Sequence, residues 1–311
     1  MNLEQEVRNG YTVSAAMKKV WAVEMELLKK LLEVCEKHHL LIWAEGGTLL
    51  GTVRHHGYIP WDDDIDMAMP RDDYDKLQAI AKDEFKKPVF FQTGYTDLFP
   101  NGMTRLRMDG TTAIFAHTIS QEYHQGIFID IFPLDAMPDD EQERKKLQQK
   151  VQKEHDDLKQ YCNIWLSFTD FSHNFKMVKL WYRIRKKGFK KCFKRYDDNF
   201  RNHARTNWSC ISLFSWFYDK RYIRKKSWYS DTIYMPFEDM QLPIPKDYDL
   251  ILRTQYGDYM KPVKAPTVHG NYVVLDAEKS YKEHLRILRK QHMWDKWKTR
   301  LQIMKKFFHF K

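Results

Sequence analysis

The sequence predicts an α+β fold in which a mixed β-sheet flanked by helices is followed by a helical, basic insertion. Three observations support this prediction. Short apolar runs alternate with helix-like stretches over 1–138, the chain becomes charged and helical over 139–235, and a proline-punctuated stretch opens the last segment, 236–311. We therefore expect a core, an insertion rich in basic and aromatic residues, and a return segment whose amphipathic C-terminal helix packs on the core.

The expected elements follow in chain order. Apolar residues at helical spacing predict an amphipathic helix over 13–38, and the apolar run 40–44 predicts a strand that ends in a turn at Gly46-Gly47. Later segments predict a strand over 65–69, a helix over 71–82, a strand over 88–93, a hairpin of 103–108 with 111–116, a strand over 126–133, a helix over 250–256 and an amphipathic tail over 277–311.

Composition excludes several classes of protein. With 311 residues, of which 43% are hydrophobic and 15% aromatic, the chain can bury a large core, which excludes a disordered protein. No apolar run approaches the ~20 residues that cross a bilayer, and the N-terminus lacks the basic and then apolar layout of a secretory signal. Four widely spaced cysteines form no CxxC pair, which favours reduced thiols. We expect a cytoplasmic protein.

The formal net charge of +10 is concentrated in one segment. Residues 176–195 contain ten Lys and Arg and no Asp or Glu, a surplus equal to that of the whole chain, with aromatic residues among the cations. We expect this segment to contact an anionic membrane surface, such as the inner face of the plasma membrane; an anionic polymer and a solvated helix face are the alternatives. Because the charge is confined to one stretch and no nucleic-acid-binding motif accompanies it, nucleic acid is not an expected partner.

The stretch "YIPWDDDIDMAM", residues 58–69, places four aspartates in five positions of an apolar, strand-like context. Burying uncompensated carboxylates costs several kcal/mol or more each, so a positive partner is required. Strand alternation puts Asp64 and Asp66 on one face, about 7 Å apart, where they can hold a divalent cation such as Mg²⁺. Asp130 is the lone acid of the apolar run 127–132. On a neighbouring strand it would complete a three-carboxylate metal site.

A glycine-rich segment precedes the acidic strand. Gly46, Gly47 and Thr48 offer backbone amides with little side chain to obstruct a phosphate. A strand, a glycine turn and a strand with two aspartates separated by one apolar residue form the layout of nucleotidyltransferase-type enzymes. In such enzymes the carboxylates hold Mg²⁺, which neutralises the charge that develops on a transferred phosphoryl group.

Other interpretations of these motifs fit less well. A calcium loop starting at Asp62 would require glycine at its sixth position, where Met67 stands, and glutamate at its twelfth, where Asp73 stands. A P-loop ending at Gly51 lacks the lysine, because Thr52 follows directly. A solvated acidic turn is disfavoured by the flanking apolar residues and by the second isolated acid.

Three blocks of the chain together resemble the LicD family of bacterial phosphorylcholine transferases, which is related to fukutin-type phosphotransferases. The blocks are "WAEGGTLLGTVRHHGYIPWDDDIDMAMPRDDYDKL", "GIFIDIFPLDAMP" and "IPKDYDLILRTQYGDYM", with His269 downstream. The resemblance implies a nucleotidyltransferase-like fold and Mg²⁺-dependent transfer of a phospho-alcohol, with phosphocholine as first choice, from a CDP-activated donor. The acceptor would be a sugar hydroxyl of a surface glycopolymer of teichoic acid, lipopolysaccharide or capsule type, and CMP would be released.

The resemblance also implies roles for the acids. Asp64 and Asp66 would be the paired metal ligands and Asp130 the third carboxylate, with Mg²⁺ or Mn²⁺ as the ion. Asp62 would hold a second ion or orient a water. Asp130 or Asp66 would accept the proton of the attacking hydroxyl.

Several further residues are candidates for contacts with the donor. They are Gly46, Gly47, Thr48, Arg54, Arg107 and His269. Arg107 and Arg105 alternate onto one strand face, where they could clamp a pyrophosphate or simply pair with acids. Arg54 lies between the glycines and the acidic strand, and His269 follows the tyrosine-rich return block; a surface or packing role is the alternative for each. The sequence Tyr256-Gly257-Asp258-Tyr259 is interpreted first as a glycine-capped helix end and second as a donor-binding element.

The nearest alternative enzyme is a glycosyltransferase that binds a nucleotide-sugar through an Asp-x-Asp metal site. That hypothesis gives no reason for the glycine turn or for the distant strand that carries Asp130.

Overall fold

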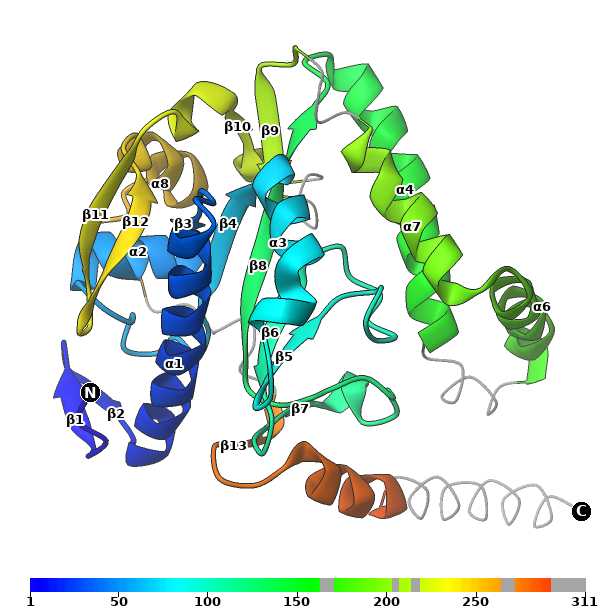
Figure 1. The fold of residues 1–311 in the computed structure, drawn as a ribbon, viewed down its shortest axis with the longest axis horizontal. Coiled ribbons are helices and arrows are strands. Elements are labelled where there is room, and N and C mark those ends of the chain that lie inside the picture. Colours follow the sequence, from blue (N-terminus) through cyan, green and yellow to red (C-terminus); the bar gives the residue numbers. More distant parts are fainter. Residues whose placement is uncertain (163–170, 203–206, 214–218, 264–271, 292–311) are drawn as a thin grey trace, which may run out of the picture.

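The computed structural model describes residues 1–311 apart from 163–170, 203–206, 214–218, 264–271 and 292–311, with the backbone alone at 171–177. Helices and sheets are mixed along the chain, which confirms the α+β class (Figure 1). The main sheet has seven strands in the described chain: β3 (Trp43–Ala44), β4 (Asp66–Pro70), β5 (Val89–Gln92), β6 (Thr104–Met108), β8 (Phe128–Met137), β9 (Cys210–Leu213) and β10 (Ile223–Lys225).

Strand β8 is the centre of this sheet. It pairs with β4 in parallel along one edge, and β4 pairs with β3. Along its other edge it pairs with β6 and then with β9, both antiparallel, and β5 and β10 lie outside these two strands. All residues of β8 are buried, which explains why this segment is an almost continuous apolar run.

The predicted hairpin of 103–108 with 111–116 is wrong. Strand β6 already has β5 and β8 on its two edges, so no edge remains for β7 (Thr112–Phe115). Instead, β7 pairs with β13 (Tyr272–Asp276) of the return segment. Two further small sheets join β1 (Glu6–Arg8) with β2 (Tyr11–Val13), and β11 (Thr232–Phe237) with β12 (Met240–Pro245).

The predicted helices of the core are confirmed with small changes of boundary. They are α1 (Ala15–Lys37), α3 (Arg71–Glu84) and α8 (Tyr248–Tyr256). The side chain of Ser14 caps α1 by accepting a hydrogen bond from the backbone N–H of Met17, 3.1 Å away. Helices α1 and α3 lie over one face of the sheet, the near face in Figure 1. Their buried side chains join the core of the sheet.

Three helices extend away from the sheet as an arm: α4 (Glu141–Cys162), α6 (Phe171–Lys187) and α7 (Phe189–Arg201) (Figure 1). The arm has a hydrophobic cluster of its own, which includes Leu158, Ile184 and Phe193. The interval 139–235 therefore contains helices, but β9 and β10 of the same interval pair in the main sheet. Its status as a separate insertion stays a prediction.

Residues 281–291 of the tail are helical. The apolar stripe expected on the tail, with Trp297, Leu301, Met304 and Phe308, lies outside the described residues. Within the described part of the chain, no helix has the length and apolar character needed to span a membrane.

Candidate active site

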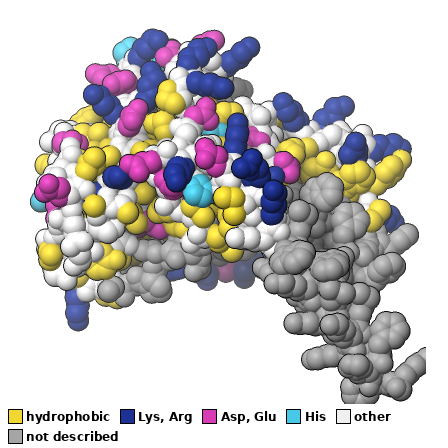
Figure 2. Space-filling view, turned by 90° about the horizontal axis from the view of Figure 1, so that it is seen from below, with side chains coloured by type: hydrophobic (Ala, Val, Ile, Leu, Met, Phe, Trp, Pro, Cys, Tyr) yellow, Lys and Arg dark blue, Asp and Glu magenta, His cyan; other side chains and the backbone are white. Residues whose placement is uncertain are grey.

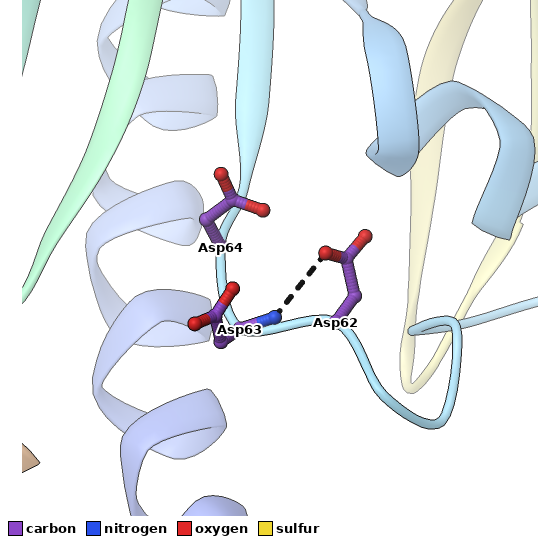
Figure 3. A group of neighbouring side chains, drawn as sticks. All are labelled: Asp62, Asp63 and Asp64. Carbon is purple, nitrogen blue, oxygen red and sulfur yellow. Dashed lines mark hydrogen bonds between the residues drawn. The ribbon is translucent and has the colours of Figure 1, made fainter. Parts of the chain in front are cut away.

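The acidic segment leads into β4. One carboxylate oxygen from each of Asp62, Asp63 and Asp64 lies within 4.8 Å of the others. Figure 3 shows the carboxyl groups of Asp62 and Asp64 rising from the same side of the chain, while Asp62 also accepts a hydrogen bond from the backbone N–H of Asp63 at 3.3 Å. Asp63, to which the sequence assigned no role, thus belongs to the cluster.

Asp66 and Asp130 extend the cluster across the sheet. They are directly paired in the parallel register of β4 and β8, which puts their side chains on one face. Strand β4 begins only at Asp66, but the backbone N–H of Asp130 donates to the carbonyl of Ile65, so strand-like geometry continues one residue back. The structure therefore pairs Asp66 with Asp130, and the charges of Asp64 and Asp130 both act on Asp66. That Asp64, Asp66 and Asp130 share one metal ion stays a prediction.

The carboxyl groups repel one another. Burial, followed by the charges of Asp64, Asp130 and other acids, raises the pKa of Asp66 well above its usual value. Burial and the charges of Asp64 and Asp63 raise the pKa of Asp62 in the same way. Both shifts show acids held close together without enough positive charge.

Asp130 has the positive partner that the sequence required. Arg105 on β6 donates from Nε to Oδ1 at 2.7 Å and from Nη2 to Oδ2 at 3.1 Å. Its guanidinium also lies 3.9 Å from the centre of the Phe128 ring. Arg105 therefore fixes the orientation of Asp130 without neutralising the acids on β4 and on the segment before it.

The expected glycine turn is instead the first turn of helix α2 (Gly46–His55). A Cβ atom at Gly47 would lie 2.5 Å from Oδ2 of Asp62, and one at Gly46 would lie 3.1 Å from Oδ2 of Asp66. Glycine is required here because the carboxylates pack against the helix. The backbone N–H groups of a first helical turn have no partner within the helix, and in α2 this turn lies next to Asp62 and Asp66.

Thr48 positions the cluster. Its Oγ1 accepts a hydrogen bond from the backbone N–H of Asp66 at 2.9 Å, which ties the start of β4 to α2. Thr48 is itself buried. Its side chain therefore holds an acid in place.

A buried ion pair beside α2 was not predicted from the sequence. Glu45, the residue before the helix, accepts two hydrogen bonds of 2.6 Å from Arg224 on β10. Arg224 also donates to Oε1 of Gln255 at 2.8 Å, and Nε2 of Gln255 donates to the hydroxyl of Tyr256 at 3.1 Å. That hydroxyl lies 4.0 Å from the Cβ position of Gly46. The chain of contacts therefore holds Tyr256 at the edge of the acidic site.

A second unpredicted acid lies behind the cluster. Glu24 on α1 is buried, and its Oε2 accepts a hydrogen bond from the hydroxyl of Tyr58 at 3.0 Å. Burial and then the charge of Asp64 raise the pKa of Glu24 well above its usual value. A single acid within an amphipathic helix carries no distinctive sequence pattern, so only the folded contacts could reveal it.

The other predicted donor contacts have different surroundings. Arg54 is half-buried at the end of α2 and donates to the carbonyl of Tyr259 at 2.6 Å. Arg107 is fully buried and donates to Gln92 and to the carbonyl of Gly126, each at 2.6 Å. Burial and the charge of Arg105 lower the pKa of Arg107 to about 9. His269 lies outside the described residues.

Comparison with known proteins agrees with this geometry. Residues 39–167 match the family model described as LicD/FKTN/FKRP, nucleotidyltransferase domain. The chain is 26% identical over 254 residues to the lipopolysaccharide cholinephosphotransferase LicD of Haemophilus influenzae, covering 76% of this chain and 88% of that protein. It is also 32% identical over 114 residues to an uncharacterised protein of Rickettsia prowazekii, covering 37% of this chain and 40% of that protein.

These matches place the chain among the phosphotransferases. The family match over residues 39–167 and the similarity to LicD confirm the resemblance found in the sequence motifs.

Proposed function

We propose that the protein transfers phosphocholine, or a closely related phospho-alcohol, from a CDP-activated donor to a sugar hydroxyl of a cell-surface glycan and releases CMP. The observation that carries this proposal is the meeting of Asp62, Asp64, Asp66 and Asp130 at the N-terminus of α2. The relative from Haemophilus influenzae favours lipopolysaccharide as the acceptor. Teichoic acid and capsule glycans are chemically similar acceptors.

The acidic cluster fits a hard divalent cation, Mg²⁺ or Mn²⁺. The site consists of carboxylates, and burial followed by the charges of neighbouring acids raises the pKa of Asp62 and of Asp66. Asp64, Asp66 and Asp130 would hold the ion, with Asp62 beside them. When bound, it would neutralise charge on the transferred phosphoryl group and on the departing CMP.

The donor phosphates would lie against the first turn of α2. The backbone N–H groups of Gly46, Gly47 and Thr48 would donate to phosphate oxygens. The hydroxyl of Tyr256 would add a fourth donor. Because it accepts from Gln255, and no acceptor within the described part of the chain takes its own proton, that proton can be donated to a phosphate.

Asp66 would act as the general base. Both oxygens of Asp130 accept hydrogen bonds from Arg105, whereas no side-chain donor within the described residues engages Asp66. In the proposed reaction the acceptor hydroxyl oxygen bonds to the distal phosphorus of the donor, the bond from that phosphorus to CMP breaks, and the hydroxyl proton passes to Asp66.

A donor screen tests the proposal. The protein is incubated with Mg²⁺ and CDP-choline, CDP-ribitol or a UDP-sugar, and release of CMP or UMP is measured. We expect CMP from CDP-choline, and a large loss in Asp64→Asn but none in Asp72→Asn, which changes an exposed acid on α3. Release of UMP alone would support the glycosyltransferase alternative, and full activity of Asp64→Asn would contradict the metal assignment.

A further inference from the structure

We propose that the outer surface of α6, continuing onto the start of α7, docks the protein on an anionic lipid bilayer. This α6 surface consists of Val178, Lys179, Tyr182, Arg185, Lys186, Lys190 and Lys191. The inference goes beyond the proposed function, because it concerns where the enzyme works and not which group it transfers.

The apolar residues of this segment divide between two sides. Leu180, Ile184, Phe189 and Phe193 are buried in the cluster of the arm. Tyr182 lies on the opposite side of the helical turn and is 61% exposed. Two of the four aromatic residues of the basic segment, Phe189 and Phe193, therefore pack in the core of the arm, whereas Tyr182 is available for an external contact.

Val178 lies one turn before Tyr182 and is 44% exposed, so the two form an apolar strip along α6. Trp181, at the margin of the strip, is half-buried under the guanidinium of Arg185, which lies 4.8 Å from the ring centre. An apolar strip of this kind is unfavourable in water and suits the interfacial layer of a membrane.

The charge around this strip has one sign. Residues 178–195 contain no acid, and only three of their cations form ion pairs: Arg183 with Asp157, Lys194 with Asp198 and Arg195 with Glu154. Within the described residues the other cations have no carboxylate partner. These are Lys179, Arg185, Lys186, Lys187, Lys190 and Lys191, and all are exposed.

The position of the surface suits docking. Helix α6 is at the end of the arm that is farthest from the main sheet (Figure 1). Figure 2 shows hydrophobic side chains among Lys and Arg at this right-hand end of the molecule. Cations bind anionic headgroups while aromatic and aliphatic side chains enter the interfacial layer. This combination favours a bilayer over a soluble polyanion, because a polyanion offers no apolar layer for Val178.

Flotation of the full-length protein with vesicles tests the proposal. One set contains equal amounts of phosphatidylglycerol and phosphatidylcholine, and the other contains phosphatidylcholine alone. We expect binding to the anionic set only, weakened by salt. Because each basic residue near such a surface contributes about fivefold to affinity, the variant Lys179→Gln/Lys186→Gln/Lys190→Gln/Lys191→Gln should bind on the order of 600-fold less tightly.

A matched control variant removes the same charge elsewhere. Lys29→Gln/Lys82→Gln/Lys87→Gln/Lys225→Gln changes four exposed lysines outside the α6 surface and should keep most of the binding. The variant Val178→Ser/Tyr182→Ser should lose binding to vesicles but keep any binding to linear polyphosphate. Equal loss in the two lysine variants, equal binding to both vesicle sets, or binding to polyphosphate without binding to vesicles would overturn the proposal.

An activity assay distinguishes failure of the docking proposal from failure of the proposed function. CMP release with CDP-choline and a water-soluble acceptor should be the same in the wild type and in all α6-surface variants. If vesicle binding fails while this activity persists, the docking proposal alone is wrong. If no CMP is released but the α6-surface lysine variant still binds anionic vesicles less tightly than the control lysine variant, only the proposed function is wrong.

Discussion

Asp66 on β4 and Asp130 on β8 are direct partners across two parallel strands, although 64 positions separate them in the sequence. Arg105 reaches Asp130 from the opposite neighbour, β6, where it is also a direct partner in the register. The three residues thus form one row across the sheet, in which Asp130 is ion-paired and Asp66 has no cationic partner among the described residues. This asymmetry distinguishes the two carboxylates and leaves Asp66 to meet a cation and a substrate.

Removal of the unpaired acid should abolish turnover without unfolding the protein. We expect Asp66→Asn to lower kcat by on the order of 10³-fold, because metal stabilisation of the transferred charge is worth several kcal/mol. Mg²⁺ should raise the melting temperature of the wild type and not that of the variant, since a ligand stabilises only a fold that binds it. Asp83→Asn, which changes an exposed acid on α3, is the control for both measurements. A Mg²⁺-dependent shift retained in Asp66→Asn would contradict the site.

We expect Tyr256 to contribute to kcat/KM through its hydroxyl group and not through its ring. A hydrogen bond to a charged group is worth about 1.5–3 kcal/mol, so Tyr256→Phe should lower kcat/KM for CDP-choline by roughly 10- to 100-fold. The melting temperature should change little, because the ring remains. Tyr234→Phe removes a hydroxyl from an exposed tyrosine on β11 and should leave both quantities unchanged. Unchanged kinetics in Tyr256→Phe would remove this residue from the donor site.

Local patterns in the sequence predicted much of the fold. The helices α1, α3 and α8 and the strand β8 follow from apolar spacing, which depends only on near neighbours. The pairing of β7 with β13 could not be predicted, because partner choice depends on which strand edges remain free after folding.

The candidate site was likewise predictable from the sequence only in part. The acids on 62–66 and at Asp130 stand out because each interrupts an apolar run. The sequence also showed that Asp130 needs a cation, but only the register of β6 identified Arg105. The pair of Glu45 and Arg224 spans 179 positions, and although Glu45 stands in a block that resembles the LicD family, nothing in the sequence links it to Arg224. Long-range ion pairs of this kind have no local signature.

The arm is joined to the core by a buried ion network whose loss should be costly. Arg71 on α3 donates to Asp135 on β8 at 2.6 and 2.7 Å, and it also contacts Asp197 on α7. Asp135→Ala would leave Arg71 buried without its main partner, so we expect a loss of about 3–5 kcal/mol in the free energy of unfolding. Denaturant titration measures this loss.

The control for that prediction is an exposed ion pair. Asp231 lies 3.7 Å from Lys246 with both side chains exposed, so Asp231→Ala should cost less than about 1 kcal/mol. If the two variants lost the same stability, the network would not tie the arm to the core.

His155 on α4 should make the protein sensitive to mild acid. Its ring stacks on Tyr196 with centroids 5.3 Å apart, and its Nε2 lies 3.2 Å from Oδ1 of Asn101. Burial and the charge of Lys159 lower its pKa to about 3. The folded state therefore binds fewer protons at this site than the unfolded state between pH 6.5 and about 3, so stability is full above pH 6.5 and is lost as the pH falls through this window.

At pH 5 this loss amounts to on the order of 1–2 kcal/mol. His155→Phe keeps an aromatic ring against Tyr196 and removes the titrating group. Its melting temperature relative to that of the wild type should therefore rise as the pH is lowered from 7 to 5. His39→Asn, at an exposed position after α1, should show no such trend. A constant difference between His155→Phe and the wild type across this range would show that His155 titrates alike in the folded and unfolded states.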